Sequence, residues 1–124
     1  MKMVIVDDSA ALRARLVEML ARIEGIEVVG QAQDAAQALA SIHALRPEVV
    51  VLDVQMPGGS GIDVLREVKR DYPETIVIML TNHADSQYRT KCMALRADYF
   101  LSKSIDSALL VEICEQLAAR GTTR

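Results

Sequence analysis

Short apolar runs alternate along this chain with segments of helical periodicity, and no other feature of the sequence constrains the fold as strongly. Five runs are rich in apolar and β-branched residues, as expected of buried strands. They span residues 4–6, 26–32, 49–52, 76–80 and 99–101. Apolar residues at helical spacing follow each run. This order predicts an α/β fold, namely a doubly wound, five-stranded parallel sheet with helices on both faces.

The boundaries of the first helices are marked by residues that begin or end helices. Ser9 and Asp34 stand where N-cap residues are expected, because their short polar side chains can accept a hydrogen bond from the first helical turn. Gly25 is expected to end the first helix. Ser9 and Asp34 separate the first two strands from the helices that follow them, and Gly25 separates the first helix from the second strand.

The second half of the chain has a turn-rich loop and one weak helix. Residues 57–61 are rich in turn formers and predict a loop before a third helix over 62–71. A fourth helix is predicted over 84–95, but its apolar face is thin. That face consists of Tyr88, Cys92 and Leu95. The thin face fits an element of low local stability.

Composition excludes several classes of protein. The 124 residues suffice for one domain, and 14 basic against 17 acidic residues give a formal net charge of −3. This balance argues against a general nucleic-acid binder, which carries a clustered basic excess. No apolar run approaches the roughly 20 residues of a membrane span, and the apolar start is too short for a signal peptide.

The two cysteines and the chain end complete the domain prediction. Cys92 and Cys114 lack paired spacing, which favours two reduced thiols in a cytoplasmic protein. We expect one domain over residues 1–120 and a frayed tail over 121–124.

Residues with charged or hydroxyl side chains follow four of the five predicted strands. Asp7 and Asp8 end the first strand, Asp53 the third, Thr81 the fourth and Lys103 the fifth. Because parallel strands end at one edge of the sheet, these side chains are expected to meet there. A lone Asp at a strand end is usually a cap or a turn former, but this explanation does not account for the whole set. For the carboxylates to meet, strands one and three must be neighbours.

Three neighbouring carboxylates predict a cation site. Their mutual repulsion is relieved by a divalent cation, and an all-oxygen donor set favours Mg²⁺. The backbone carbonyl of Gln55 could add a further oxygen. With the ammonium of Lys103 and the hydroxyl of Thr81, the set suits a phosphoryl group, and Asp53 could itself become an aspartyl phosphate.

The chain resembles the receiver domains of two-component response regulators over essentially its whole length. Four motifs carry the resemblance: Val6-Asp7-Asp8-Ser9, the segment from Val51 to Pro57 with Gly61 beyond it, Leu80-Thr81-Asn82, and Phe100-Leu101-Ser102-Lys103. Each motif alone would be weak, but the combination is highly specific. The resemblance implies a flavodoxin-like strand order, 2-1-3-4-5.

The resemblance also implies a role for each carboxylate. Asp53 corresponds to the residue that is phosphorylated. Asp8 corresponds to a direct Mg²⁺ ligand, Asp7 to an acid that holds the ion mostly through water, and the Gln55 carbonyl to the backbone ligand.

The remaining implied roles concern switching and the lifetime of the phosphoryl group. Lys103 corresponds to the lysine that pairs with the phosphoryl oxygens, and Thr81 to the switch hydroxyl. Phe100 corresponds to the aromatic residue that turns inward when the threonine moves. We predict that Gln55 and His83, which flank the path of the attacking water in the family, tune that lifetime.

Three residues depart from the family pattern. Ser104 follows Lys103 where proline after a cis bond is usual, which leaves the geometry of this bond open. Arg96 replaces a frequent glycine, and Asn82 is larger than the usual alanine or glycine and could narrow access to Asp53.

We expect a stand-alone response regulator, a link in a two-component or phosphorelay pathway. A histidine kinase or histidine phosphotransfer protein would donate the phosphoryl group, and the domain would catalyse its own phosphorylation and dephosphorylation without being a conventional enzyme. Phosphorylation would change a surface that binds a downstream protein, with no nucleic acid or membrane contact by this chain. The family often forms homodimers through its last two helices, which leaves the oligomeric state open.

Two alternatives use the same fold or similar chemistry. A docking module that works without phosphorylation is kept open by Asn82, Arg96 and Ser104. A small phosphatase with an aspartyl intermediate would need a general acid two residues after its nucleophile, and Gln55 at that position cannot serve as one.

Overall fold

The computed structural model describes residues 1–56, 59–82, 86–104 and 106–122. Along the chain the elements are β1 (Lys2–Val6), α1 (Ala10–Ala21), β2 (Glu27–Ala32), α2 (Ala35–Leu45), β3 (Val49–Leu52), β4 (Gln55–Met56), β5 (Gly59–Ser60), α3 (Gly61–Asp71), β6 (Ile76–Thr81), α4 (Ser86–Ala94), β7 (Tyr99–Ser102) and α5 (Ser107–Thr122).

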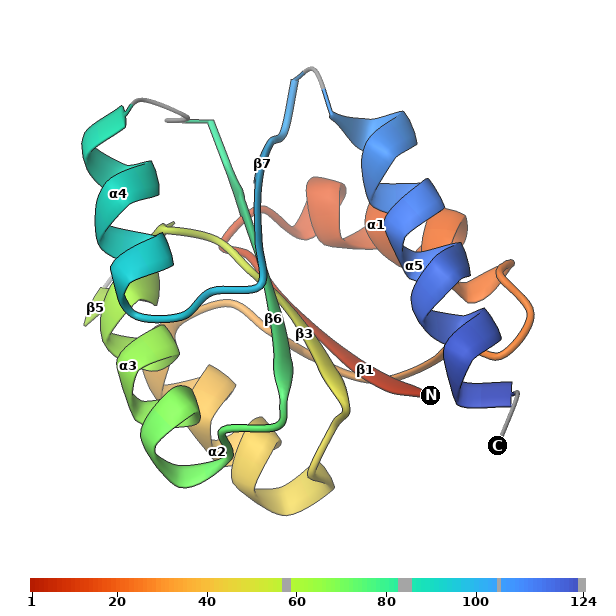
Figure 1. Cartoon of the computed structure of the whole chain (residues 1–124), viewed down its shortest axis with the longest axis horizontal. Helices are drawn as coiled ribbons and strands as arrows, with labels where there is room; N and C mark the ends of the chain where they lie inside the picture. The colour runs from red at the N-terminus through yellow and green to blue at the C-terminus, as the bar shows by residue number, and fades with distance from the viewer. Residues whose placement is uncertain (57–58, 83–85, 105, 123–124) are drawn as a thin grey trace.

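A five-stranded parallel sheet forms the centre of the molecule (Figure 1). Its strands lie in the order β2-β1-β3-β6-β7, and β1 pairs with β3 so that Val6 lies beside Leu52. Helices α1 and α5 cover one face, and α2, α3 and α4 cover the other. The predicted doubly wound fold and its flavodoxin-like strand order are therefore confirmed.

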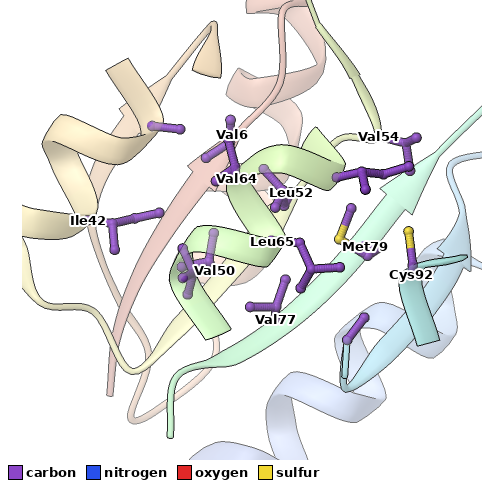
Figure 2. Packing of buried hydrophobic residues seen from close by; sticks show 14 of the residues in the cluster. Val6, Ile42, Val50, Leu52, Val54, Val64, Leu65, Val77, Met79 and Cys92 are labelled. Carbon is purple, nitrogen blue, oxygen red and sulfur yellow. The ribbon is translucent and has the colours of Figure 1, made fainter. Parts of the chain in front are cut away.

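Each strand contributes side chains to both hydrophobic layers, because alternate residues of a strand point to opposite faces. In β3, Val50 and Leu52 pack toward α2, α3 and α4, as Figure 2 shows. Val49 and Val51 belong to the cluster beneath α1 and α5. All four are almost completely buried, which explains why the strand reads as one continuous apolar run.

The predicted helix starts are confirmed, but one predicted end is not. The Ser9 hydroxyl accepts a hydrogen bond from the Leu12 amide (3.2 Å), and the Asp34 carboxylate accepts one from the Gln37 amide (2.8 Å). Helix α1 ends at Ala21, earlier than Gly25. Gly25 instead has φ 91°, a left-handed conformation that glycine adopts without strain, in the turn before β2.

Two elements differ from the sequence expectation around the third and last helices. Strand β5 lies within the predicted loop over 57–61 and pairs antiparallel with β4, which comes just before that loop; residues 57 and 58 lie outside the described ranges. Helix α5 continues through Thr122, so two of the four residues predicted as a frayed tail are helical. The other two, 123 and 124, are not among the described residues.

Helix α4 has the thin apolar face that the sequence predicts. Cys92 is fully buried, and Tyr88 and Leu95 are partly buried against the same core cluster. The helix begins at Ser86, and residues 84 and 85 of the predicted helix are outside the described ranges. After it, Arg96 has φ 71°, the left-handed conformation that the glycine of the family pattern would favour.

Both cysteines are free and buried. Burial raises the pKa of the Cys114 thiol to about 11 and also raises the pKa of Cys92. The prediction of two reduced thiols agrees with these positions.

An ion pair of the buried Lys69 joins α3 to the segments just before β6 and β7. Lys69 donates hydrogen bonds to the Asp98 carboxylate (2.8 Å) and to the Thr75 carbonyl oxygen (2.7 Å). The same carboxylate oxygen accepts a hydrogen bond from the Val77 amide (2.8 Å). Lys69 is 7% exposed, so loss of Asp98 would leave a buried charge with only the Thr75 carbonyl oxygen as its partner.

Replacing Asp98 with alanine is expected to lower the free energy of unfolding by about 2–3 kcal/mol, because the Lys69 ammonium loses its counter-ion. Urea titration followed by circular dichroism would measure the change. Asp71→Ala is the matched control, since Asp71 pairs with Arg70 on the exposed surface of α3 and should cost far less. Equal losses in the two variants would contradict this role for Asp98.

Candidate functional site

Three carboxylates meet where β1 and β3 end. One oxygen each from Asp7, Asp8 and Asp53 lies within 4.8 Å of the others. The backbone explains this convergence, because the Asp53 amide donates to the Val6 carbonyl oxygen across the β1–β3 pair (3.0 Å). The sequence prediction that strands one and three are neighbours is therefore correct, and the acidic cluster of Asp7, Asp8 and Asp53 is present.

The three acids differ in burial. Asp7 is 2% exposed and Asp53 5%, whereas Asp8 is exposed. An Asp7 oxygen accepts a hydrogen bond from the Ser9 amide (2.8 Å), and an Asp53 oxygen accepts one from the Gln55 amide (3.3 Å). The two buried carboxylates are thus oriented by the backbone just after their own strands.

Lys103 bridges the two buried carboxylates. Its Nζ lies 2.5 Å from Asp7 Oδ2 and 3.1 Å from Asp53 Oδ2. Its backbone amide donates to the Thr81 carbonyl oxygen (2.9 Å), which fixes the end of β7 against the end of β6. No cis peptide bond occurs among the described residues, so the Lys103–Ser104 bond is trans.

Burial and neighbouring charges change the acidity of this site. Burial raises the pKa of Asp53, and the negative charge of Asp7 adds to that rise, while Lys103 opposes it. Burial alone would lower the pKa of Lys103, but hydrogen bonds and attraction from Asp7 and Asp53 outweigh it and raise the pKa. The ammonium therefore stays charged, while burial disfavours the charged form of the Asp53 carboxyl even with Lys103 beside it.

Thr81 and Phe100, the predicted switch pair, are both buried. Thr81 is fully buried at the end of β6, and Phe100, on β7, is 5% exposed and packs in the cluster beneath α4. The guanidinium of Arg89 lies 5.7 Å from the centre of the Phe100 ring. Tyr99 packs in the opposite cluster, as the alternation of a strand predicts.

The side chain of Gln55 reaches away from its strand to α4. Its amide nitrogen donates a hydrogen bond to the Tyr88 hydroxyl (2.7 Å). The sequence placed Tyr88 only on the apolar face of the fourth helix, so this polar contact was missed. His83, the other residue predicted to tune the phosphoryl lifetime, lies outside the described residues. Asn82 is exposed.

Arg13 is a second cation beside the site that sequence reasoning missed. Its Nη1 donates a hydrogen bond to the Asp7 carbonyl oxygen (2.5 Å), and its buried Nε has no hydrogen-bond partner among the described residues. Its position in the first turns of α1 could have predicted that it lies near the acidic residues, because helical side chains lean toward the helix N-terminus. Here that end of α1 follows directly from Asp7 and Asp8.

Gly61 permits the close approach of α3 to the acidic strand end. A Cβ at Gly61 would lie 1.7 Å from the carbonyl oxygen of Asp53. The Gly61 amide also donates a hydrogen bond to the Val54 carbonyl oxygen (2.8 Å), which holds the two segments together. The lack of space for a side chain explains why glycine stands at this position of the motif.

The acidic cluster suits Mg²⁺ chemically. The cluster offers only oxygen donors, and two of its carboxylates, Asp7 and Asp53, share the ammonium of Lys103. The carboxylates of Asp7, Asp8 and Asp53 and the Gln55 carbonyl would hold such an ion.

A second group of possible ligands lies away from this cluster, on α2 and α3. It consists of His43, Glu67 and Asp71. Arg70 pairs with both acids, at 3.0 Å from Asp71 and 3.5 Å from Glu67, and Tyr72 hydrogen-bonds the His43 ring. All three residues therefore have partners within a surface network of ion pairs and hydrogen bonds.

Comparison with known proteins agrees with the geometry of the site. Residues 3–115 match the family model of the response regulator receiver domain, and the chain belongs to this family. The response regulator GacA of Pseudomonas aeruginosa is 33% identical over 118 residues, which cover 95% of this chain and 55% of GacA. The chain spans about half the length of the GacA relatives that it matches, from 48% to 55%.

Solved structures show the same fold. The response regulator domain of Thermotoga maritima CheB has a TM-score of 0.87 at 25% identity and covers 96% of each chain. The CheX-CheY-BeF3-Mg complex of Borrelia burgdorferi has a TM-score of 0.84 at 25% identity, over 94% of this chain and 87% of that one. Within the described residues, no helix has both the length and the apolar character to cross a bilayer.

Gly61→Ala is expected to destabilise the protein by about 3 kcal/mol, because the new methyl group would overlap the Asp53 carbonyl and force the backbone apart. Chemical denaturation would measure this loss. Gly30→Ala is the control, since its Cβ would meet the flexible tip of Leu45 at 2.7 Å. It should cost no more than about 1 kcal/mol. A tolerated alanine at position 61 would contradict the required close approach.

Asp53→Asn is expected to raise the melting temperature at neutral pH when divalent cations are chelated. An acid whose pKa is raised by folding lends stability below its unfolded-state pKa, and this contribution is lost as the pH rises through the folded-state pKa. The asparagine does not ionise, so its advantage over the wild type should grow from acidic to neutral pH. Thermal melts across this range would show it.

The control is Asp63→Asn, which removes one negative charge from an exposed ion pair with Arg66. This variant should follow the wild type at every pH. If the difference in melting temperature between Asp53→Asn and the wild type shrinks as the pH rises, the raised pKa of Asp53 is contradicted.

Proposed function

We propose that this chain is a phosphorylation-activated signalling switch in which Asp53 accepts the phosphoryl group. The observation that carries the proposal is the position of Asp53, a buried carboxylate held between the Lys103 ammonium and the acidic partners Asp7 and Asp8. Membership of the receiver family supports the same role. The phosphoryl donor would be a histidine kinase or a histidine phosphotransfer protein.

The chemistry is a transfer between a nitrogen and an oxygen. An Asp53 carboxylate oxygen attacks the phosphorus of a phosphohistidine, the P–N bond breaks, and the imidazole leaves with the bonding electron pair. Lys103 pairs with the phosphoryl oxygens, and the Thr81 hydroxyl donates a hydrogen bond to them. A bound Mg²⁺ would supply further positive charge to the same oxygens. Later attack by water returns Asp53 to its carboxylate, so the domain catalyses both its own phosphorylation and dephosphorylation.

The signal would be read as a change of a protein-binding surface. When Thr81 moves toward the phosphoryl group, Phe100 and α4 adjust, and the face made by α4, β7 and α5 changes. The thin apolar face of α4 suits this role, because an element with few buried contacts changes conformation at low cost. Phe100, buried beneath α4, links the sheet to that helix.

The cellular setting follows from this function. The partners would be a cytoplasmic kinase or phosphotransfer protein and a downstream protein, with no nucleic acid bound by this chain. Homodimer formation through the last two helices would be consistent with the family. We propose that residues 1–120 form the receiver domain. The signalling activity is proposed for this domain alone.

Incubation of the protein with a small phosphodonor and Mg²⁺ should add the mass of one phosphoryl group, measured by intact-protein mass spectrometry. Asp53→Asn should abolish the gain, because the amide is not a nucleophile for this transfer. Asp63→Asn, which alters an exposed acid on α3, should still be phosphorylated. A full mass gain in Asp53→Asn would refute the assignment.

Calorimetric titration with Mg²⁺ separates the switch from a docking module that works without phosphorylation. The switch should bind the ion, and the combined variant Asp7→Asn, Asp8→Asn should lose binding. Absence of both Mg²⁺ binding and phosphorylation in the wild type would favour the docking module.

A further inference from the structure

A hydrogen bond connects the segment after the proposed phosphorylation site to the helix proposed to switch. The Gln55 side-chain amide donates to the Tyr88 hydroxyl at 2.7 Å. The Gln55 backbone amide at the same time donates to the Asp53 carboxylate at 3.3 Å. One residue therefore contacts Asp53 through its backbone and α4 through its side chain.

Packing fixes the position of the Tyr88 hydroxyl. The Tyr88 ring lies partly buried against the core cluster that contains Met56, Cys92 and Phe100. A tyrosine held in this way presents its hydroxyl at a defined place, because its apolar body is packed and its polar tip is free to form hydrogen bonds. The flexible Gln55 side chain, which is exposed, therefore gains a fixed anchor on α4.

The hydrogen bond to Tyr88 uses one end of the Gln55 side-chain amide and leaves the other end as an acceptor. A glutamine amide has a donor end, Nε2, and an acceptor end, Oε1. With Nε2 bound to Tyr88, Oε1 remains as the end of the side chain that can accept a hydrogen bond from water. Hydrolysis of an aspartyl phosphate needs a water that is held in line with the phosphorus, and an acceptor for a water hydrogen provides such orientation.

We propose that Tyr88 is a positioning residue for loss of the phosphoryl group, acting through Gln55. In this step the oxygen of water bonds to phosphorus, and the P–O bond to Asp53 breaks. Asp53 leaves as a carboxylate, and the released proton passes to solvent. Gln55 orients the water and takes no proton. The inference rests on the proposed function, and it makes the lifetime of the phosphoryl group depend on the position of α4.

The test is Tyr88→Phe, which keeps the packed ring and removes only the hydroxyl. After phosphorylation with a small phosphodonor and removal of the donor, loss of the phosphoryl group should slow about threefold to fivefold, the effect expected from one hydrogen bond. The rate of phosphoryl uptake should stay within about twofold of the wild type, since the hydroxyl does not contact Asp53. Tyr72→Phe is the matched control, because its hydroxyl bonds His43 on α2.

A double-mutant cycle with Gln55→Ala tests whether Tyr88 acts through Gln55. Gln55→Ala should slow the loss, and the combined variant should be no slower than Gln55→Ala alone. An unchanged or faster loss in Tyr88→Phe would overturn the proposal. So would additive effects in the cycle, or equal slowing of uptake and loss, which would indicate a structural role.

The outcomes also separate this inference from the proposed function. If the wild type takes up no phosphoryl group, or takes it up at a residue other than Asp53, the proposed function fails and the inference with it. If the wild type is phosphorylated on Asp53 and Tyr88→Phe loses the group at the wild-type rate, only the role of Tyr88 is refuted.

Discussion

The contact on which the rest of this structure depends is the bridge from Lys103 to two buried carboxylates, Asp7 and Asp53. It joins the ends of three strands, since the acids follow β1 and β3 and the lysine follows β7. Burial raises the pKa of Asp53 and the negative charge of Asp7 adds to the rise, while the Lys103 ammonium opposes it. The strand order β2-β1-β3-β6-β7 is what brings these distant parts of the sequence together.

Much of the fold could be predicted from the sequence, because its signals are local and repeated. The apolar runs of β3 and β6 are buried on both faces, so their hydrophobicity reports directly on their position. Ser9 and Asp34 cap the helices after them by contacts only three residues long. The acidic cluster was predictable for a related reason, because parallel strands deliver their last residues to the same edge.

The features that sequence reasoning missed depend on contacts between side chains far apart in the chain. The Gln55–Tyr88 hydrogen bond spans 33 positions, and the Lys69–Asp98 ion pair spans 29. Nothing in the local pattern of either residue indicates its partner. Arg13 is an intermediate case, since helix direction points it at the acidic strand end but does not specify the Asp7 carbonyl as its acceptor. Such pairings require the packed arrangement itself.

The burial of Cys92 and Cys114 has a consequence for how the protein responds to oxidative stress. Peroxides and disulfides react with the thiolate, and a thiol whose pKa lies near 11 is almost wholly protonated inside a cell. Both sulfur atoms are also shielded from such reagents by the surrounding side chains. The two thiols are therefore expected to stay unreactive when the redox state of the cell changes.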